Sequence, residues 1–292
     1  MASKAVSSPK GSGMTFTTRK RIGSLVTSVV MILVALVCAV PLWYIVINSF
    51  KTTTEMAVNP LGLPRQWVFD NYTTAFGEGT MVRSFANTII VTVAGVAFQV
   101  LIGSLAAYGM ILRRSFFTSF VGVLLMVAFV IPGQATLIPL YRMEASAGLV
   151  NTLEGLVVMY LGGAVFCYFL IVGYMKSLPF ELIEAARIDG AGPLRIFWSI
   201  VLPMARPAIV TISILSFQGS WNELSHFIVS TQSSALTTLT KGVASLASGQ
   251  LSAGNQYPVK LAAAVVMTIP VAVLFFIFQK QIMNSSEGSV KE

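Results

Sequence analysis

The sequence predicts an all-α membrane protein with six transmembrane helices, and its composition is the first reason. Of its 292 residues, 55% are hydrophobic and only 10% are charged, whereas a soluble domain carries about 25% charged residues. The charged residues stand in short clusters between apolar runs, six of which are long enough to cross a bilayer. This pattern leaves too little polar surface for a water-soluble globule, and it excludes the continuous basic face of a nucleic-acid-binding protein.

The amino-terminal segment 1–21 is predicted to be a flexible cytoplasmic tail, because it is rich in Ser, Thr, Lys and Gly and poor in large apolar side chains. An apolar run then extends from Ile22 to about Asn48 and forms the first predicted span. A cleaved signal peptide has a similar basic start, but its apolar region is only about 7 to 15 residues long. We therefore expect this run to remain as a membrane helix.

Five further spans are predicted from runs of about 20 apolar residues, the length that crosses a hydrocarbon core about 30 Å thick. The run at 116–141 contains Pro132 and Pro139, which free backbone carbonyls and predict a bent helix beside a polar pathway. Residues 22–283 thus form one transmembrane domain, and 284–292 form a second cytoplasmic tail. The five spans cover residues 85–112, 116–141, 152–175, 204–230 and 258–282.

The orientation of these spans follows from the uneven distribution of lysine and arginine. Thirteen of these residues lie in the tails and in the loops on the same side as the tails, and six lie in the opposite loops. Positive residues are retained on the cytoplasmic side of a membrane. Both termini are therefore predicted to be cytoplasmic, as an even number of spans requires.

The cytoplasmic loop 177–203, between the fourth and fifth spans, is predicted to form two short helices. Pro179 suits the first position of a helix, and Gly190 can take the left-handed conformation that ends one. A second helix is expected to begin at Pro193, directly after Gly192. The loop therefore presents two short helices at an angle.

On the first of these helices, small and apolar side chains share one surface. Such a surface can press into a groove on another protein. A helix that lies along the membrane face and merely joins two spans fits the spacing equally well. The surface consists of Leu182, Ala185, Ala186 and Asp189, flanked by Glu184 and Arg187.

The loop resembles the EAA loop of ABC importer permeases. The resemblance lies in Glu184-Ala185-Ala186, in Asp189-Gly190-Ala191 and in Leu202-Pro203. Further similarity, at Asn48-Ser49-Phe50-Lys51 and Trp221-Asn222-Glu223 among other places, covers most of the chain and favours the carbohydrate branch. Within that branch the chain is similar to the smaller permease subunit of maltose-type importers.

The resemblance implies a permease in the plasma (inner) membrane of a prokaryote. Its implied partners are a second homologous permease, a pair of ATP-binding subunits and an extracytoplasmic sugar-binding protein. In that family the EAA loop forms the coupling helix, which docks in the ATP-binding subunit. Relatives end in a tail rich in Gly and Ala that reaches the ATPase, and residues 284–292 depart from that pattern. The implied ATPase-coupling residues are Glu184, Ala185, Ala186, Asp189 and Gly190.

The expected substrate pathway uses amide, carboxylate and aromatic side chains, which recognise sugar hydroxyls and ring faces. Glu223 and His226 are the ionisable residues inside a predicted span, where such groups usually face a cavity or a partner. Glu223 can equally cap a helix distortion or pair within a dimer interface, and His226 is expected to be structural. Tyr141 also suits a membrane interface. The pathway candidates are Gln134, Tyr141, Gln218, Trp221, Asn222 and Glu223.

The sequence therefore predicts a permease subunit that translocates a sugar or oligosaccharide. A permease for a polyol or glycerol phosphate is the alternative within the family, and an ion-coupled secondary transporter would need paired intramembrane charges or inverted repeats.

The chain is not expected to be an enzyme, because it lacks a GxxxxGK[ST] phosphate loop. ATP and Mg²⁺ are expected in the partner ATPase, and no cofactor in this chain. Cys38 and Cys167 stand alone in apolar runs, so no metal site is expected.

Overall fold

The computed structural model describes residues 16–77, 80–112, 115–247 and 256–287, and these ranges contain helices and no strand. The all-helical prediction is therefore confirmed. The first part of the chain forms α1 (Phe16–Asn48), α2 (Thr53–Val58), α3 (Asp70–Gly77), α4 (Thr80–Leu112), α5 (Phe116–Val130), α6 (Gly133–Ser146), α7 (Leu153–Tyr160), the 3-10 helix η1 (Leu161–Gly163) and α8 (Ala164–Met175). The second part forms α9 (Phe180–Ile188), α10 (Pro193–Ile196), the π-helix η2 (Phe197–Val201), α11 (Leu202–Met204), α12 (Arg206–Trp221), α13 (Ser225–Ser230), the 3-10 helix η3 (Ser234–Leu236), α14 (Leu239–Ala247) and α15 (Tyr257–Glu287).

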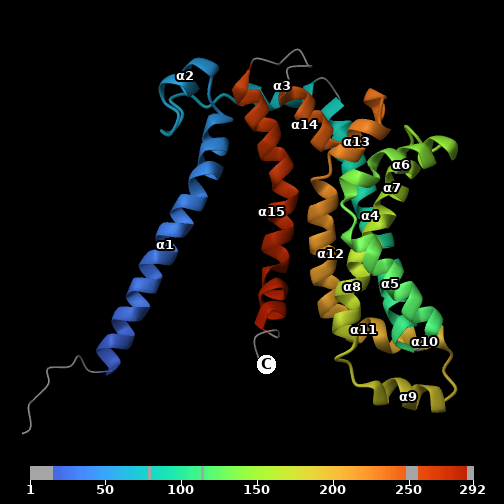
Figure 1. Cartoon of the computed structure of the whole chain (residues 1–292). Coiled ribbons are helices and arrows are strands. Elements are labelled where there is room, and N and C mark those ends of the chain that lie inside the picture. Colours follow the sequence, from blue (N-terminus) through green and yellow to red (C-terminus); the bar gives the residue numbers. More distant parts are fainter. Residues whose placement is uncertain (1–15, 78–79, 113–114, 248–255, 288–292) are drawn as a thin grey trace, which may run out of the picture.

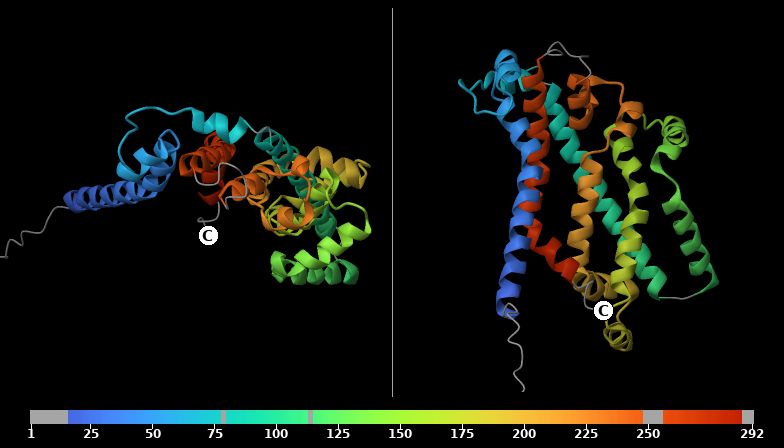
Figure 2. Two further views of the ribbon diagram at one scale, coloured as in Figure 1. Left: turned by 90° about the horizontal axis from the view of Figure 1, so that it is seen from above. Right: turned by 60° about the vertical axis from the view of Figure 1, so that its left-hand side comes forward.

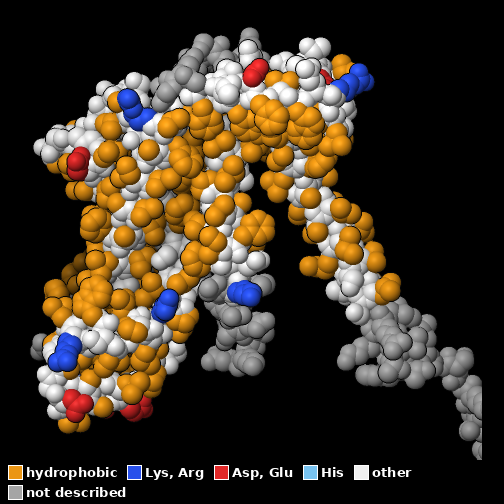
Figure 3. Space-filling model, turned by 180° about the vertical axis from the view of Figure 1, so that it is seen from behind, with side chains coloured by type: hydrophobic (Ala, Val, Ile, Leu, Met, Phe, Trp, Pro, Cys, Tyr) orange, Lys and Arg blue, Asp and Glu red, His pale blue; other side chains and the backbone are white. Residues whose placement is uncertain are grey.

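Four segments of the described chain are long and apolar enough to cross a membrane without a sharp bend. They are Ser24–Asn48, Met81–Leu112, Leu153–Met175 and Tyr257–Lys280. Hydrophobic side chains cover the flanks of the molecule, and the charged side chains lie mainly toward its two ends (Figure 3). This distribution suits a protein surrounded by lipid.

Two further candidate spans are bent pairs of helices, so the described chain has four spans, or up to six if each pair counts as one. In the first pair, α5 and α6 meet at 105°. Pro132 stands at this bend, where the sequence predicted a bent helix, and its missing N–H cannot continue α5. In the second pair, the segment Pro193–Met204 meets α12 at 79°, with Ala205 between them.

The predicted fifth span, 204–230, is not one continuous helix, because the chain leaves the helical path between α12 and α13. The side-chain amide of Asn222 donates to the carbonyl oxygen of Gln218 at 2.8 Å. The Oε1 atom of Glu223 accepts from the backbone N–H of His226 at 3.2 Å. Side chains thus supply hydrogen bonds to the backbone on both sides of the break, as short polar residues do at helix ends.

The elements that connect the long helices gather at two ends of the molecule. At one end, α9 lies across the bundle, and α1 begins and α15 ends there as well (Figure 1). At the other end lie α2, α3, α6, α13 and α14. Toward its first residues α1 leans away from the other helices, and α5 stands on the opposite flank (Figures 1 and 2). The side chains of α1 consequently remain almost entirely exposed along its span.

Helix α4 packs closely against α7 and α8 because glycines remove side chains from the contact. A Cβ atom on Gly95 would lie 2.7 Å from the ring of Tyr160. A Cβ atom on Gly103 would lie 2.7 Å from the Cβ of Cys167 and 2.9 Å from the carbonyl oxygen of Ala164. Small residues allow helix backbones in membranes to approach in this way.

Buried polar side chains fasten the segment that follows α1, at the end of the molecule opposite α9. Lys51 is fully buried, and its Nζ donates to the carbonyl oxygen of Asn59 at 2.6 Å. Burial lowers the pKa of Lys51, and the carboxylate of Glu55 acts in the opposite direction. The amide of Asn71 donates to the carbonyl oxygens of Ser49 and Lys51, each at 2.8 Å. These bonds hold the loop against the end of α1.

We predict that Gly103→Ala destabilises the chain, because the new Cβ atom meets backbone atoms of α8 that cannot move aside. Overpacking of this kind typically costs about 1–3 kcal/mol. Gly109→Ala is the matched control, since Gly109 lies on the same helix and a Cβ atom there would meet nothing within 4 Å. The midpoint of thermal unfolding in detergent should fall for Gly103→Ala alone. Equal midpoints for the two variants would contradict the close approach of α4 and α8.

Candidate functional site

The first candidate site is the loop 177–203, in which two short helices form for local reasons. Pro179 caps α9 with an extended backbone. Gly190 follows the helix with a φ of +80°, a left-handed conformation that favours glycine. Gly192 then caps α10, and Pro193 occupies its first turn. Both helices that the loop sequence predicted are present.

Helix α9 has one face against the bundle and another face that is exposed in the described chain. Ile183 is buried, and Ala186 packs against the same hydrophobic cluster. Of the five predicted coupling residues, four are exposed and Ala186 is partly buried. The exposed residues on and just after this helix include Leu182, Glu184, Ala185, Ile188, Asp189 and Gly190.

The second candidate site is an open cavity of about 610 Å³ lined by residues of α4, α5, α6, α7, α8, α12 and α13. Apolar side chains, among them Phe166 and Phe227, make up much of its wall. Sites for small molecules commonly combine such an apolar wall with a few convergent polar groups. The polar side chains that line it are Gln99, Thr136, Tyr160, Ser216, Ser220, Glu223 and His226.

Three interruptions of the long helices border this cavity. Ile131 lies at the bend between α5 and α6, and Gly162 and Gly163 lie in the 3-10 turn between α7 and α8. Glu223 lies in the gap between α12 and α13. Backbone groups that a break leaves without helical partners need protein or water partners inside a membrane. Three separate breaks at one place therefore bring backbone polar groups to the wall of a cavity that is otherwise largely apolar.

Glu223 is the one carboxylate in the described cavity lining, which includes no lysine or arginine. Its Oε1 lies 3.2 Å from Nδ1 of His226, and both side chains are partly exposed. The same oxygen accepts the backbone N–H of His226, which holds the carboxylate at the start of α13. A carboxylate in this position can accept hydrogen bonds from hydroxyl groups inside the cavity.

A hydrogen-bonded group that the sequence analysis did not identify joins α4, α7 and α12. The hydroxyl of Tyr160 donates to the carbonyl oxygen of Ser220 at 2.6 Å. The amide of Gln99 donates to the hydroxyl of the same serine at 3.4 Å. Gly163 leaves room for this amide, because a Cβ there would lie 2.7 Å from Gln99. Gln99 could have been found from the sequence, since it is a polar residue inside the second predicted span.

A clasp of hydrogen bonds joins α6 to α13 at the end of the molecule opposite α9. Glu144, one turn beyond the cavity-lining Leu140, is buried and accepts from the hydroxyl of Ser230 at 2.7 Å. The other oxygen of Glu144 has no hydrogen-bond partner among the described residues. The N–H of Asn151 donates to the carbonyl oxygen of Ser230, and its Oδ1 accepts from the N–H of Ser233, each at 2.9 Å. The loop after α6 is thus fastened to the end of α13.

The six residues predicted for the substrate pathway do not gather in one place. Glu223 lines the cavity. Trp221 is fully buried, stacks on Phe217 and donates to the carbonyl oxygen of Met267 at 3.0 Å, so it packs α12 against α15. The other four residues also lie outside the cavity lining. Of these four, Tyr141 is partly buried, and Gln134, Gln218 and Asn222 are exposed. Their role in transport stays a prediction.

The two cysteines lie apart from each other and from any cluster of metal ligands. Cys38 is exposed on α1, and Cys167 is buried with its sulfur 3.3 Å from the hydroxyl of Ser216. Across the described ranges, no group of three or more His, Cys, Asp or Glu side chains could hold a metal ion. The groups that the described cavity presents to a ligand are hydrogen-bonding and apolar side chains.

Comparison with protein families gives a match over residues 99–284, more than half of the chain. The matching family is described as binding-protein-dependent transport system inner membrane component. The matched part of this chain runs from the cavity-lining Gln99 through the loop with α9 and into α15. Both candidate sites therefore lie within the matched region.

Individual relatives match over nearly the whole length of the chain. The diacetylchitobiose uptake system permease protein of Streptomyces coelicolor is 32% identical over 91% of this chain and 88% of its own. The melibiose/raffinose/stachyose import permease protein of Bacillus subtilis is 34% identical over 90% of this chain and 96% of its own. A chain from a bacterial ABC transporter that imports the acidic polysaccharide alginate superposes with a TM-score of 0.77. At 24% identity over 92% of this chain and 99% of that one, this likeness concerns the fold alone.

We predict that Ser230→Ala destabilises the chain, because neither oxygen of the buried Glu144 would then have a partner within the described chain. An unsatisfied buried polar group costs about 1–3 kcal/mol, and more if it is charged. Ser225→Ala, on the same short helix, is the control, since no side-chain hydrogen bond of Ser225 is found among the described residues. Thermal unfolding in detergent compares the two. A wild-type midpoint for Ser230→Ala would show that the hydrogen bond between Ser230 and Glu144 contributes nothing to stability.

Proposed function

The chain belongs to the family of binding-protein-dependent transport system inner membrane components, and we propose that it is the permease subunit of an ABC importer for a sugar or oligosaccharide. The observation that carries this proposal is the convergence of three helix interruptions on one cavity. Such a cavity lets a polar solute pass between helices whose outer faces are apolar. Permease subunits of this family have no ATPase site of their own, so ATP and Mg²⁺ bind in a partner subunit.

The cavity lining favours an uncharged solute that is rich in hydroxyl groups. Glu223, Gln99 and Ser220 can exchange hydrogen bonds with hydroxyls, and aromatic walls can face a sugar ring. Glycerol phosphate fits less well, because its phosphate would meet the Glu223 carboxylate where the described lining offers no lysine or arginine. The two relatives, by name, take up diacetylchitobiose and melibiose, raffinose or stachyose, which are also saccharides.

The proposed topology has six spans with both termini on the cytoplasmic side of the bacterial inner membrane. The excess of lysine and arginine on that side supports it. The shared position of α9, the start of α1 and the end of α15 at one end of the molecule also supports it (Figure 1).

The proposed divisions of the chain are a tail at 1–21, the transmembrane domain at 22–283 and a tail at 284–292. Helix α1 begins at Phe16 and α15 ends at Glu287, so both boundaries fall inside helices. Residues 1–15 and 288–292 of the tails lie outside the described residues.

The proposed coupling site is the exposed face of α9, formed by Glu184, Ala185 and Asp189, with Gly190 at its end and Ala186 partly buried. This face would dock on an ATP-binding subunit. When ATP closes the partner subunits, α9 is pushed, and the attached α8 and α12 tilt around the cavity. Access to the cavity then switches from one side of the membrane to the other, as in rigid-body alternation.

The proposed assembly contains a second, homologous permease, a pair of ATP-binding subunits and an extracytoplasmic sugar-binding protein. The exposed apolar length of α1 supports a contact with lipid or with the second permease. The pathway residues Gln134, Tyr141, Gln218 and Asn222 fit this assembly, because surfaces outside the described cavity can face a pathway shared with the second permease.

We predict that Glu184→Ala lowers solute-stimulated ATP hydrolysis and uptake together, because it removes a charge from the docking face of α9. Loss of one interfacial charged contact typically weakens binding by about 2–5 kcal/mol when the contact is buried in the complex. Glu181→Ala is the matched control, since Glu181 is exposed on the same helix and stands outside the resemblance. Activity is measured with the complete complex in proteoliposomes. Equal losses for both variants, or for neither, would contradict the docking role of Glu184.

The solute class is tested in the same proteoliposomes with a labelled solute and excess competitors. Uncharged oligosaccharides should suppress uptake, whereas glycerol phosphate should not. Suppression by glycerol phosphate alone would replace the sugar proposal with the alternative from the same family.

A further inference from the structure

Tyr108 reaches from α4 into the loop that carries α9. Its side chain is buried, and its hydroxyl donates to the carbonyl oxygen of Pro193 at 2.9 Å. Pro193 is the first residue of α10, so the bond ends at the point where the loop turns back toward the membrane helices. The two residues are far apart in the chain, and this hydrogen bond is a tertiary link.

The accepting carbonyl lies at an unusual part of the backbone. The Pro193 carbonyl also accepts the N–H of Phe197, where α10 passes into the π-helix η2. Short π-helical segments are frequent at functional sites, because they shift the register of the helix. The Tyr108 hydroxyl therefore fixes the start of the segment that connects α9 to α12.

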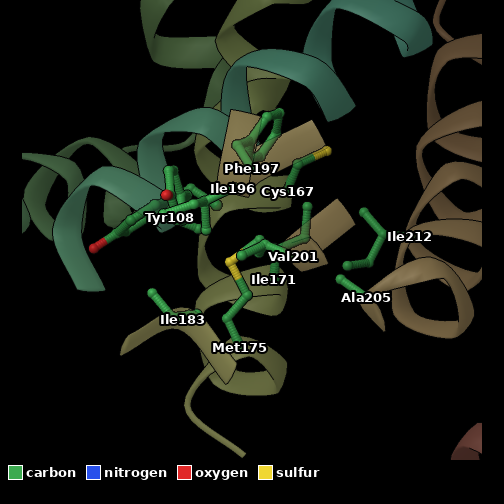
Figure 4. Close-up of a cluster of buried hydrophobic side chains, with 12 residues drawn as sticks. Tyr108, Cys167, Ile171, Met175, Ile183, Ile196, Phe197, Val201, Ala205 and Ile212 are labelled. Carbon is green, nitrogen blue, oxygen red and sulfur yellow. The ribbon is translucent and has the colours of Figure 1, made fainter. Parts of the chain in front are cut away.

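The aromatic ring of Tyr108 adds an apolar contact to this hydrogen bond. It lies 5.4 Å from the ring of Phe197, centroid to centroid. Figure 4 shows Tyr108, Ile196 and Phe197 close together in one buried cluster. Ile183 of α9 and Met175 of α8 belong to the same cluster. The loop is thus seated on both α4 and α8.

The contact with Tyr108 joins the loop to a helix that is not its neighbour in the chain. The loop continues covalently from α8 at one end and into α12 at the other, but α4 has no such connection to it. Helix α4 also lines the cavity through Gln99, nine residues before Tyr108. At 1.5 Å per residue the two side chains stand roughly 14 Å apart along one continuous helix. A displacement of the loop can therefore reach the cavity wall through α4 if Tyr108 holds the two together.

We propose that Tyr108 is a positioning residue that couples the loop 177–203 to α4. Through this link, movement of α9 is passed to the cavity wall at Gln99 as well as to α8 and α12. The inference rests on the proposed function, since it assumes that a partner ATPase displaces α9. A single neutral hydrogen bond changes such an equilibrium by about two- to tenfold, which sets the size of the expected effect.

The test is Tyr108→Phe in the complete transporter, because this change removes the hydroxyl and keeps the ring against Phe197. Tyr168→Phe is the matched control. Tyr168 is buried in the same cluster, and within the described chain its hydroxyl has no hydrogen-bond partner. The measured quantities are solute imported per ATP hydrolysed, ATPase activity without solute, stimulation by the loaded binding protein, and the thermal unfolding midpoint.

We expect Tyr108→Phe to lower the imported solute per ATP and the stimulation about two- to tenfold. Its ATPase activity without solute should match that of Tyr168→Phe, and its unfolding midpoint should fall by no more than the loss of one hydrogen bond explains. An unchanged ratio of solute to ATP would overturn the inference. A parallel fall of ATPase activity, uptake and midpoint would also overturn it, because that pattern indicates a purely structural role. If the wild-type complex itself imports solute without ATP, the proposed function fails, whatever the variants do.

Discussion

Every backbone N–H and C=O group inside a bilayer needs a partner, and this constraint explains where the helices of this permease are interrupted. The bend at Pro132, the 3-10 turn at Gly162 and Gly163, and the gap at Glu223 all border one cavity. The described helices α1, α4 and α15 run without such breaks. The cavity is therefore the place where irregular backbone is tolerated, and it is also the place where a polar solute can be accommodated.

Helix α4 connects that cavity to the opposite end of the molecule. Its glycines at 95 and 103 bring it into close contact with α7 and α8, so the three helices pack tightly. Gln99 lies between these glycines in sequence and lines the cavity, while Tyr108 lies beyond them and contacts the loop. Close packing of this kind transmits displacement along a helix and does not absorb it. The arrangement suits a subunit that converts a push at one end into a change of shape at the other.

Local chemistry made part of this structure predictable. Gly190, Gly192 and Pro193 have backbone preferences that determine the ends of α9 and α10, and Pro132 removes an N–H that α5 would need. The bond between Tyr160 and Ser220 could not be predicted, because it depends on how separate helices pack together. Trp221 shows the same limit: its type suggested a pathway, whereas its burial between α12 and α15 is decided by Phe217 and Met267. Single residues thus predicted turns and bends, and tertiary packing decided which side chains face the cavity.

The central claim is that this chain transports only as part of an ATP-driven assembly. Purification of the tagged chain from its native membrane, with identification of the proteins that accompany it, tests this claim most directly. We expect an ATP-binding subunit, a second permease and a sugar-binding protein to be recovered with it, and uptake by the reconstituted complex to require ATP. A chain that purifies alone and transports solute without ATP would contradict the account and identify it as a secondary transporter.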